Sequence, residues 1–337
     1  MATRTIAAPA SVLVYVNGDL VGDGVMKLPF VRALRHSFPA ARITWLAGIW
    51  KSAYAHQLAP LVQGLIDEVI EEAGADHPYR WVARRPMNGR RFDLIIDTQR
   101  AVLTSLLVRR IRHRYVISGA ADFLLSDIRP KSGYQRPKAM VAQMLDLLVL
   151  ATGRPAESIP VRPLDSSLAA AAAARLPLGP TYVGLAPGAG GRHKCWPLES
   201  FIALAQAQVV RGRMPVFLLG PQESALLEPL MNAVPQALFP ASQNGVAAGV
   251  CDSPVLTVAL AARLAVGVAN DAGAGHMIAA AGIPLVSLFG PTSPEKFAPT
   301  AKRLTVLRAQ SFGGEAMAAI PVEAVIAAVD DALAARP

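Results

Sequence analysis

Short runs of β-branched and apolar residues alternate with longer helix-like segments along the chain. Helix-like segments lie, for example, at 25–37 and 99–110. Continuous apolar strands separated by helices predict a parallel sheet that is covered on both faces. The first half of the chain is therefore expected to form a Rossmann-like unit from the runs SVLVYV (11–16), RITWLA (42–47), IDEVI (66–70), DLIID (93–97) and RYVIS (114–118).

A second series of the same kind begins after residue 180, with clear helical segments at 197–211 and 274–282. Its strand-like runs are TYVGLA (181–186), MPVFLLG (214–220), QALF (236–239), LAVGVAND (264–271) and PLVSLFG (284–290). The fold class is therefore α/β, with two doubly wound Rossmann-like domains. In such sheets ligands bind outside the carboxyl ends of the strands, so we expect two facing sheets to enclose a central cleft with a site on each wall.

The two series are separated by a polar, proline-rich stretch, TGRPAESIPVRPLDSS (152–167), which is typical of a linker. We place the boundary near residue 165, so that the expected domains are 1–165 and 166–337. The final helical segment, VEAVIAAVDDALAA (322–335), is a candidate to pack back across the first domain.

The charge of the chain is concentrated in its first half. Residues 1–150 carry 20 Lys and Arg against 12 Asp and Glu, whereas the whole chain has a formal net charge of +9. Such a field favours an anionic partner, which could be nucleic acid, phosphorylated lipid or a membrane surface. Nucleic acid is the weaker alternative, because aromatic residues are not interleaved with the basic clusters.

Cysteine content and hydropathy indicate the compartment. The two cysteines, Cys195 and Cys251, have no metal-binding spacing and form no disulfide framework, which fits a reducing cytoplasm. The apolar stretch at the N-terminus is too short for a signal peptide, and no run of 18 apolar residues is free of a charge or a helix breaker. We therefore expect any membrane association to be peripheral.

The segment VLVYVNGDLVGDGVMKLPFVRALR reads as strand, loop and helix, with Asp23 between two glycines at the turn. One interpretation makes Asp23 the N-cap of the helix, because carboxylates accept hydrogen bonds from the free N–H groups there. The other makes it a functional carboxylate. Asp19 lies in the same loop and is a second candidate, either functional or merely solvated. The spacing does not match the G-x-G-x-x-G dinucleotide fingerprint.

Two glycine-rich turns follow strands of the second series. LAPGAGGRHKCWPLESF (185–201) brings Arg192 and Lys194 to a turn whose small residues allow close approach to a phosphate, although it is not a Walker A loop. GVANDAGAGHMIAAAGIPLVSLFGPTSPEKF (267–297) places Asp271 at a strand end before a helix whose N–H groups suit a diphosphate. His276 is either a packed or capping histidine or a ligand-binding one.

Three of these segments, GDGVMKLPFVRALRHSFPAARITWLA, PGAGGRHKCWPLESF and NDAGAGHMIAAAGIPLVSLFGPTSP, occur in the order and spacing of one family. Over roughly residues 11–335 the chain resembles the ADP-heptose:lipopolysaccharide heptosyltransferases of glycosyltransferase family 9. The resemblance implies a two-domain GT-B fold with an N-terminal acceptor domain and a C-terminal donor domain. It further implies inverting transfer of a heptose from ADP-heptose to a sugar acceptor, with no cofactor and no obligatory metal. The chain has no D-x-D metal motif.

The resemblance also implies roles for individual residues. Asp23 matches the proposed general base, which must remove a proton from the acceptor hydroxyl as it displaces ADP. Lys194 would neutralise the leaving diphosphate, and Asp271 would hold the sugar. The donor-binding residues implied are Gly188, Ala189, Lys194, Asp271, Gly273, His276, Gly290 and Thr292.

The basic clusters 84–91, 109–114 and 129–138 are candidates to receive an anionic glycolipid and to hold the enzyme at the inner membrane surface, although they equally fit a solvated basic surface. Their named candidates are Arg84, Arg85, Arg112 and Arg136.

The chain departs from the family pattern at Asn17, at Ala272 and at the pair Ala274–Gly275. These departures leave open another nucleotide sugar, a protein or small-molecule acceptor, or a non-catalytic nucleotide-binding module.

Overall fold

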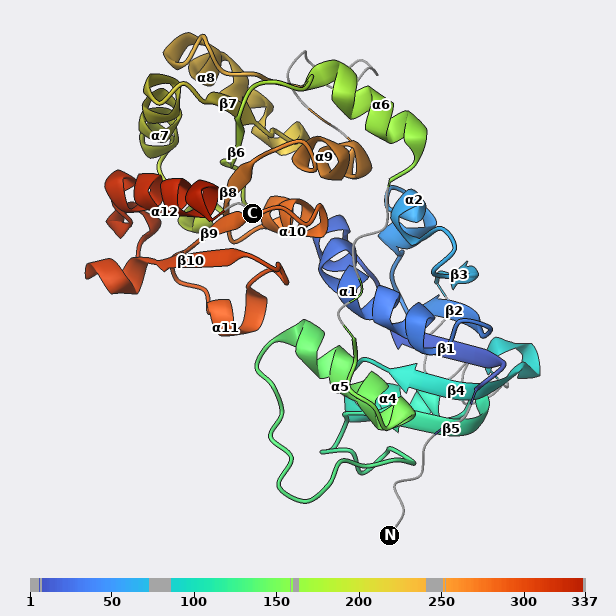
Figure 1. Cartoon of the computed structure of the whole chain (residues 1–337). Coiled ribbons are helices and arrows are strands. Elements are labelled where there is room, and N and C mark those ends of the chain that lie inside the picture. The colour runs from blue at the N-terminus through green and yellow to red at the C-terminus, as the bar shows by residue number, and fades with distance from the viewer. Residues whose placement is uncertain are drawn as a thin grey trace. The chain divides into compact units, whose positions relative to one another are not determined.

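The computed structural model describes residues 6, 8–72, 86–157, 159, 164–240, 251 and 253–335. The chain divides into two compact units, Met1–Ile159 and Pro160–Pro337, and each contains its own five-stranded sheet (Figure 1). All strand pairs in both sheets are parallel. The acceptor and donor roles expected for the two halves remain predictions.

The first unit has the strand order β3-β2-β1-β4-β5. Its strands are β1 (Ser11–Val16), β2 (Arg42–Ala47), β3 (Glu68–Ile70), β4 (Arg91–Asp97) and β5 (Arg112–Ser118). Its helices are α1 (Val21–Ser37), α2 (Ala59–Val62), α4 (Val102–Val108) and α5 (Met140–Thr152). The order reverses between β1 and β4, which is the switch point at which open sheets of this type bind ligands.

The helices of the first unit cover both faces of its sheet. Because β1–α1–β2 and β4–α4–β5 run in opposite directions across the sheet, right-handed crossovers put α1 and α4 on opposite faces. Leu107 and Val108 of α4 pack with Leu13 and Tyr15 of β1, while α5 packs against α1. The central strand is consequently buried along its length, as its apolar run predicts.

The second unit has the strand order β10-β9-β8-β6-β7, with its switch point between β6 and β8. Its strands are β6 (Tyr182–Ala186), β7 (Met214–Phe217), β8 (Val266–Asn270), β9 (Leu285–Phe289) and β10 (Leu304–Arg308). Its helices are α6 (Ser166–Arg175), α7 (Leu198–Val210), α8 (Leu227–Ala233), α9 (Pro254–Ala261), α10 (Gly273–Ala280), α11 (Pro294–Phe297) and α12 (Val322–Ala334).

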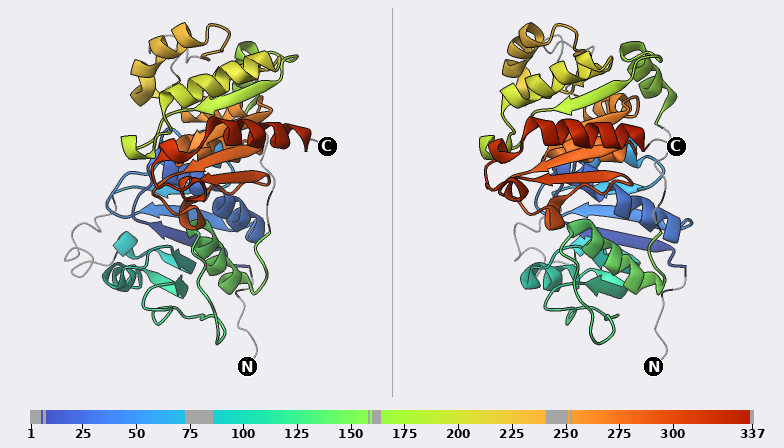
Figure 2. Two further views of the ribbon diagram at one scale, coloured as in Figure 1. Left: turned by 90° about the vertical axis from the view of Figure 1, so that its left-hand side faces the viewer. Right: turned by 60° about the vertical axis from the view of Figure 1, so that its left-hand side comes forward.

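The second sheet separates two hydrophobic clusters. Val183 and Leu185 of β6 face the cluster that contains α7 and α12, whereas Tyr182 and Ala186 face the cluster that contains α6, α9 and α10. Alternation along the strand thus fills both cores. Helix α12 packs against α7, β8 and β9 of its own unit (Figure 2), so its apolar face is occupied within the second unit.

One strand of the second unit differs from the sequence prediction. The QALF segment forms no strand of the sheet: Leu238 makes a single bridge to Val216, and Phe239 stacks on Phe217 with ring centroids 5.3 Å apart. The fifth strand is β10, which the sequence analysis did not predict. It pairs with β9 along its whole length and is only partly buried, so it lacks the continuous apolar signal of the central strands.

An ion-pair cluster lies at the amino edge of the first sheet. Arg90 binds Glu68 with two hydrogen bonds of 2.9 and 2.8 Å, and the Thr44 hydroxyl donates a third of 3.0 Å. The hydrogen bonds from Arg90 lower the pKa of Glu68 to about 2. Arg90 belongs to the first basic cluster of the sequence, and in the structure it is engaged in this pair.

This cluster predicts a pH-dependent contribution to stability. A lowered pKa means that the folded protein binds fewer protons than the unfolded chain, so the stability from Glu68 is present above about pH 4.5 and is lost as the pH falls toward 2. We expect Glu68→Gln to lower the unfolding free energy by about 1 kcal/mol at neutral pH. Urea unfolding at several pH values should show that the difference in unfolding free energy between the wild type and Glu68→Gln becomes smaller as the pH falls. A difference that is constant with pH would contradict the assignment.

Candidate functional site

Asp23 lies in the first turn of α1 and is exposed. The N-cap position of this helix is Leu20, which provides no side-chain hydrogen bond. The N-cap interpretation of Asp23 is therefore wrong, although its carboxylate still benefits from the positive end of the helix. The structure leaves this side chain available at the carboxyl edge of the first sheet.

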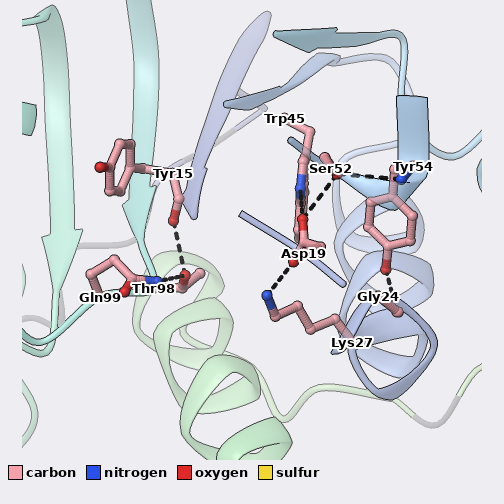
Figure 3. Close-up of polar contacts among 9 residues, drawn as sticks. All are labelled: Tyr15, Asp19, Gly24, Lys27, Trp45, Ser52, Tyr54, Thr98 and Gln99. Carbon is pink, nitrogen blue, oxygen red and sulfur yellow. Dashed lines mark hydrogen bonds and ion pairs between the residues drawn. The ribbon is translucent and has the colours of Figure 1, made fainter. Parts of the chain in front are cut away.

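Asp19 has the opposite environment and is 4% exposed. Its carboxylate accepts hydrogen bonds from Trp45 Nε1 at 2.8 Å and Ser52 Oγ at 3.0 Å, and it forms an ion pair with Lys27 (Figure 3). Three partners satisfy a buried charge that would otherwise be costly. Of the two carboxylates in this loop, Asp19 thus holds the local structure and Asp23 faces solvent.

The close packing around Gly24 explains why a second glycine follows Asp23. A Cβ at this position would lie 2.6 Å from Leu58 Cδ1, and the Tyr54 hydroxyl donates to the Gly24 carbonyl at 2.7 Å. Burial, followed by the nearby Asp19 charge, raises the pKa of Tyr54 well above its usual value, which keeps it a neutral donor. The start of α1 is thereby fixed against the segment that follows β2.

A cavity of about 800 Å³ opens beside Asp23 within the first unit. It is formed by the turn after β1, by the segment after β2 and by Glu72. Its lining residues are Asn17, Gly18, Asp19, Leu20, Val21, Asp23, Ile49, Trp50, Lys51, Ser52, Ala53, His56, Gln57 and Glu72. The volume is in the range of small-molecule sites. The cavity therefore places a solvent-facing carboxylate where a ligand can meet it.

In the second unit, Lys194 and Asp271 meet at the switch point. Lys194 ends a short 3₁₀ turn after β6, and Asp271 follows β8 directly. Their Nζ and Oδ2 atoms are 3.3 Å apart, and the side chains are 30% and 9% exposed. The two residues come from sequence positions far apart, and they form one charged pair at the carboxyl edge of the sheet.

Asn270 holds these two turns together and was missed by the sequence analysis. It is fully buried at the end of β8, where Nδ2 donates to the Pro187 carbonyl at 2.8 Å. Its Oδ1 accepts from the Trp196 backbone N–H at 3.1 Å. Because Asn270 directly precedes Asp271 and its side chain binds both ends of the turn that carries Lys194, the positions of Lys194 and Asp271 are linked.

The other residues expected to bind the donor lie around the same edge. Gly188 and Ala189 follow β6, while Gly273 is the first residue of α10 and His276 lies in the first turn of that helix. Gly290 follows β9, and a Cβ there would be 2.8 Å from Met317 Sδ. A Cβ at Gly188 would be 2.3 Å from Glu223 Oε1, the end of a flexible side chain that can move, so packing requires glycine at Gly290 more strongly than at Gly188.

Thr292 carries an unpaired polar atom. Its Oγ1 is buried and has no hydrogen-bond partner among the described residues, and it lies just beyond the carboxyl end of β9. An unsatisfied buried hydroxyl costs free energy unless a ligand supplies the partner. Thr292 therefore stays a candidate ligand contact at this edge.

We expect Thr292→Val to weaken ADP binding about 10-fold while changing the unfolding free energy by less than about 1 kcal/mol, because the lost hydroxyl has no partner within the protein. Calorimetric titration and thermal unfolding measure the two quantities. Ser287→Ala is the matched control, since Ser287 Oγ is also buried and unpaired but lies inside β9. Equal loss of ADP affinity in both variants would argue against a specific contact.

Two of the four expected acceptor arginines, Arg112 and Arg136, are described, and they lie at opposite edges of the first sheet. Arg112 begins β5 and so lies at the amino edge of the sheet, opposite to the cavity. Arg136 lies beyond the carboxyl end of β5, where it donates to the Gly119 carbonyl at 2.9 Å and covers the Phe123 ring. Arg84 and Arg85 lie outside the described residues.

Further polar groups at the first switch point were also missed. Thr98 and Gln99 follow β4; Thr98 Oγ1 donates to the Tyr15 carbonyl at 2.9 Å, as Figure 3 shows. Asp97 accepts from the Gln99 backbone N–H at 2.9 Å, and burial raises the pKa of this carboxyl. Their position directly after a predicted strand was a signal that could have identified them.

No group of three or more His, Cys, Asp or Glu side chains in the described ranges is arranged to hold a metal ion. Two parallel Rossmann-like sheets, each with polar groups at its carboxyl edge, define the GT-B class of two-domain proteins. The family model for glycosyltransferase family 9 (heptosyltransferase) matches residues 80–317. The chain belongs to this family.

Individual relatives are consistent with this membership. Lipooligosaccharide heptosyltransferase 2 of Haemophilus influenzae is 34% identical over 129 residues, which span 37% of this chain and 36% of that relative. A family 9 glycosyltransferase from Veillonella parvula DSM 2008 has a TM-score of 0.71 at 18% identity, covering 97% of this chain and 98% of the other. The E. coli ADP-heptose lps heptosyltransferase II has a TM-score of 0.66 at 21% identity, covering 96% and 98%. The solved structures support the same fold.

Proposed function

We propose that the protein is an inverting glycosyltransferase that transfers a heptose from ADP-heptose to a sugar acceptor, with the lipopolysaccharide inner core as the acceptor class. The observation that carries the proposal is the solvent-facing Asp23 beside a cavity in a member of the heptosyltransferase family. The acceptor class is supported by the similarity to the H. influenzae lipooligosaccharide heptosyltransferase 2. Transfer to a protein or a small molecule is the alternative acceptor assignment.

In the proposed reaction, Asp23 accepts the proton of an acceptor hydroxyl while that oxygen forms a bond to the anomeric carbon. The bond between the anomeric carbon and the diphosphate oxygen breaks on the opposite side, which inverts the configuration and releases ADP. Lys194 balances the charge that develops on the diphosphate, and the N–H groups at the start of α10 and the Thr292 hydroxyl bind its oxygens. Protein groups thus supply the positive charge in the proposed mechanism.

Titration of the purified protein with ADP, UDP, GDP and NAD tests the donor assignment. Selective ADP binding followed by turnover of ADP-heptose with a heptose-deficient lipopolysaccharide is the expected result. Preference for UDP or GDP would indicate that the donor is another nucleotide sugar. Nucleotide binding without any turnover would favour a non-catalytic module. Binding of NAD alone would overturn the proposal.

We also propose that the protein works on the cytoplasmic face of the inner membrane through peripheral contact. Among the described segments, no helix has the length and apolarity needed to cross a bilayer. Helix α4 exposes Leu103 and Leu106, and Arg109, which directly follows the helix, donates to the Leu125 carbonyl in the loop that exposes Leu124. The exposed cation Arg129 donates to the Leu124 carbonyl at 3.0 Å and so lies beside this apolar surface. Apolar groups with basic neighbours suit an anionic lipid surface.

Cosedimentation with vesicles tests this contact. We expect the protein to bind vesicles containing phosphatidylglycerol and not vesicles of phosphatidylcholine alone, with binding weakened several-fold in the Leu103→Ser, Leu106→Ser double variant because the apolar contact is lost. The Val210→Ser variant removes an exposed apolar residue from the second unit and serves as the control. Equal binding of both vesicle types would contradict the proposal.

A further inference from the structure

Trp50 and Lys51 form a part of the cavity wall that the proposed chemistry does not use. Both residues follow β2 and line the cavity beside Asp23. Trp50 is 64% exposed, and Lys51 is exposed as well. A large aromatic side chain left open to water inside a concave site is a recurring feature of ligand-binding surfaces.

The backbone of this wall is fixed to the turn that carries Asp23. Gly18, with φ +132°, packs so closely on Trp50 that a Cβ on the glycine would lie 2.4 Å from Trp50 Cβ. The Asp19 backbone N–H donates to the Lys51 carbonyl at 3.1 Å, and the Ala53 N–H donates to the Asp19 carbonyl at 2.9 Å. The backbone of Trp50 and Lys51 is therefore held at a defined place relative to the start of α1.

Lys51 is the cation that the cavity offers to a ligand. His56, which also lines the cavity, is within 3.1 Å of Glu71 Oε2, and the buried Lys27 is paired with Asp19. Lys51 has no acidic partner among the described residues. An ammonium group on a flexible stem binds a carboxylate or phosphate through charge-assisted hydrogen bonds. The apolar faces of a sugar ring stack on an aromatic surface beside it.

We propose that Trp50 and Lys51 form an acceptor subsite for a sugar ring that carries a negatively charged group. The ring lies against the indole, the carboxylate or phosphate of the sugar binds the Lys51 ammonium, and a ring hydroxyl is directed toward Asp23. This subsite rests on the proposed function, because it is the acceptor side of the same reaction. It makes Trp50 and Lys51 specificity-determining residues for the acceptor.

Ligand-detected NMR titration of the full-length protein with glucuronate, glucose 6-phosphate and glucose tests the subsite directly. We expect at least one of the two anionic sugars to bind about 10-fold more tightly than glucose, because the charged pair adds to the stacking contact. The comparison between glucuronate and glucose 6-phosphate distinguishes a carboxylate from a phosphate as the preferred group. Equal affinity for all three sugars, or no binding of either anionic sugar, would overturn the proposal.

Variants separate the two contacts. Lys51→Gln is expected to remove the preference for the anionic sugar, whereas Trp50→Ala weakens all three sugars and Trp50→Phe restores part of the binding. Lys302→Gln changes an exposed lysine of the second unit and is expected to have no effect. Unchanged sugar binding in the Lys51 and Trp50 variants would contradict the subsite.

The sugar titration needs no donor and no turnover, so its outcome is independent of the nucleotide titration. If the protein does not bind ADP but still binds the anionic sugars in a Lys51-dependent way, the assignment of ADP-heptose as donor is contradicted and the subsite is supported. If Lys51→Gln turns over ADP-heptose normally with an unchanged KM for the acceptor, the proposed function is supported and the subsite is contradicted.

Discussion

The Asp23→Asn variant is expected to transfer sugar about 10³-fold more slowly than the wild-type protein, because an amide cannot accept the acceptor proton that a general base removes. The substitution keeps the size of the side chain. Asp23 is exposed and does not cap α1, so the fold should tolerate the change. The ADP contacts that we propose lie in the second unit, so the dissociation constant for ADP should stay within about 2-fold of the wild type. Initial rates with ADP-heptose and calorimetric titration with ADP measure the two effects.

Two comparisons make this result specific. Asp331→Asn changes an exposed carboxylate on α12 and should leave the rate unchanged. Asp19→Asn changes the buried carboxylate that binds Trp45, Ser52 and Lys27, so it should lower stability, and any loss of rate should follow the loss of folded protein. Normal turnover in a folded Asp23→Asn protein would exclude Asp23 as the base.

The sequence predicted the sheets best where both faces of a strand are buried. The expected runs 11–16 and 42–47 coincide with β1 and β2, because continuous apolar residues leave little freedom in where the strand lies. The prediction failed at the edges of the second sheet. The half-exposed β10 carries no continuous apolar run, and the apolar residues of QALF are used in ring packing against Phe217 instead of strand pairing.

The residues of the candidate site were also predicted from the sequence only in part. Sequence motifs identified Lys194 and Asp271, and the structure places their charged groups 3.3 Å apart. The same reasoning could not separate Asp19 from Asp23, because the difference depends on hydrogen bonds from Trp45 and Ser52, which are distant in sequence. The acceptor arginines were inferred from local charge density, which carries no information on which edge of a sheet a residue occupies.

The Lys194→Ala variant is expected to lower kcat/KM for ADP-heptose about 10²-fold, because it removes a positive charge that is proposed to balance the leaving diphosphate. Lys194 is held in the turn after β6, and its Nζ lies 3.3 Å from Asp271 Oδ2. Without Lys194, the largely buried Asp271 carboxylate would repel the diphosphate as well. ADP affinity should therefore fall together with the rate, in contrast to the Asp23 variant. Titration with ADP and initial rates distinguish the two patterns.

Arg192 provides the matched control, because it lies in the same 3₁₀ turn and is exposed, and because it forms no ion pair with Asp271 among the described residues. Arg192→Ala should change kcat/KM by less than about 3-fold if position and not net charge decides the effect. The double variant Lys194→Ala, Asp271→Asn should recover part of the lost ADP affinity, since the repulsive carboxylate is then neutral, while transfer stays slow. Equal losses in the two single variants would show that the turn acts only through its overall charge, and the assignment of Lys194 to the leaving diphosphate would fail.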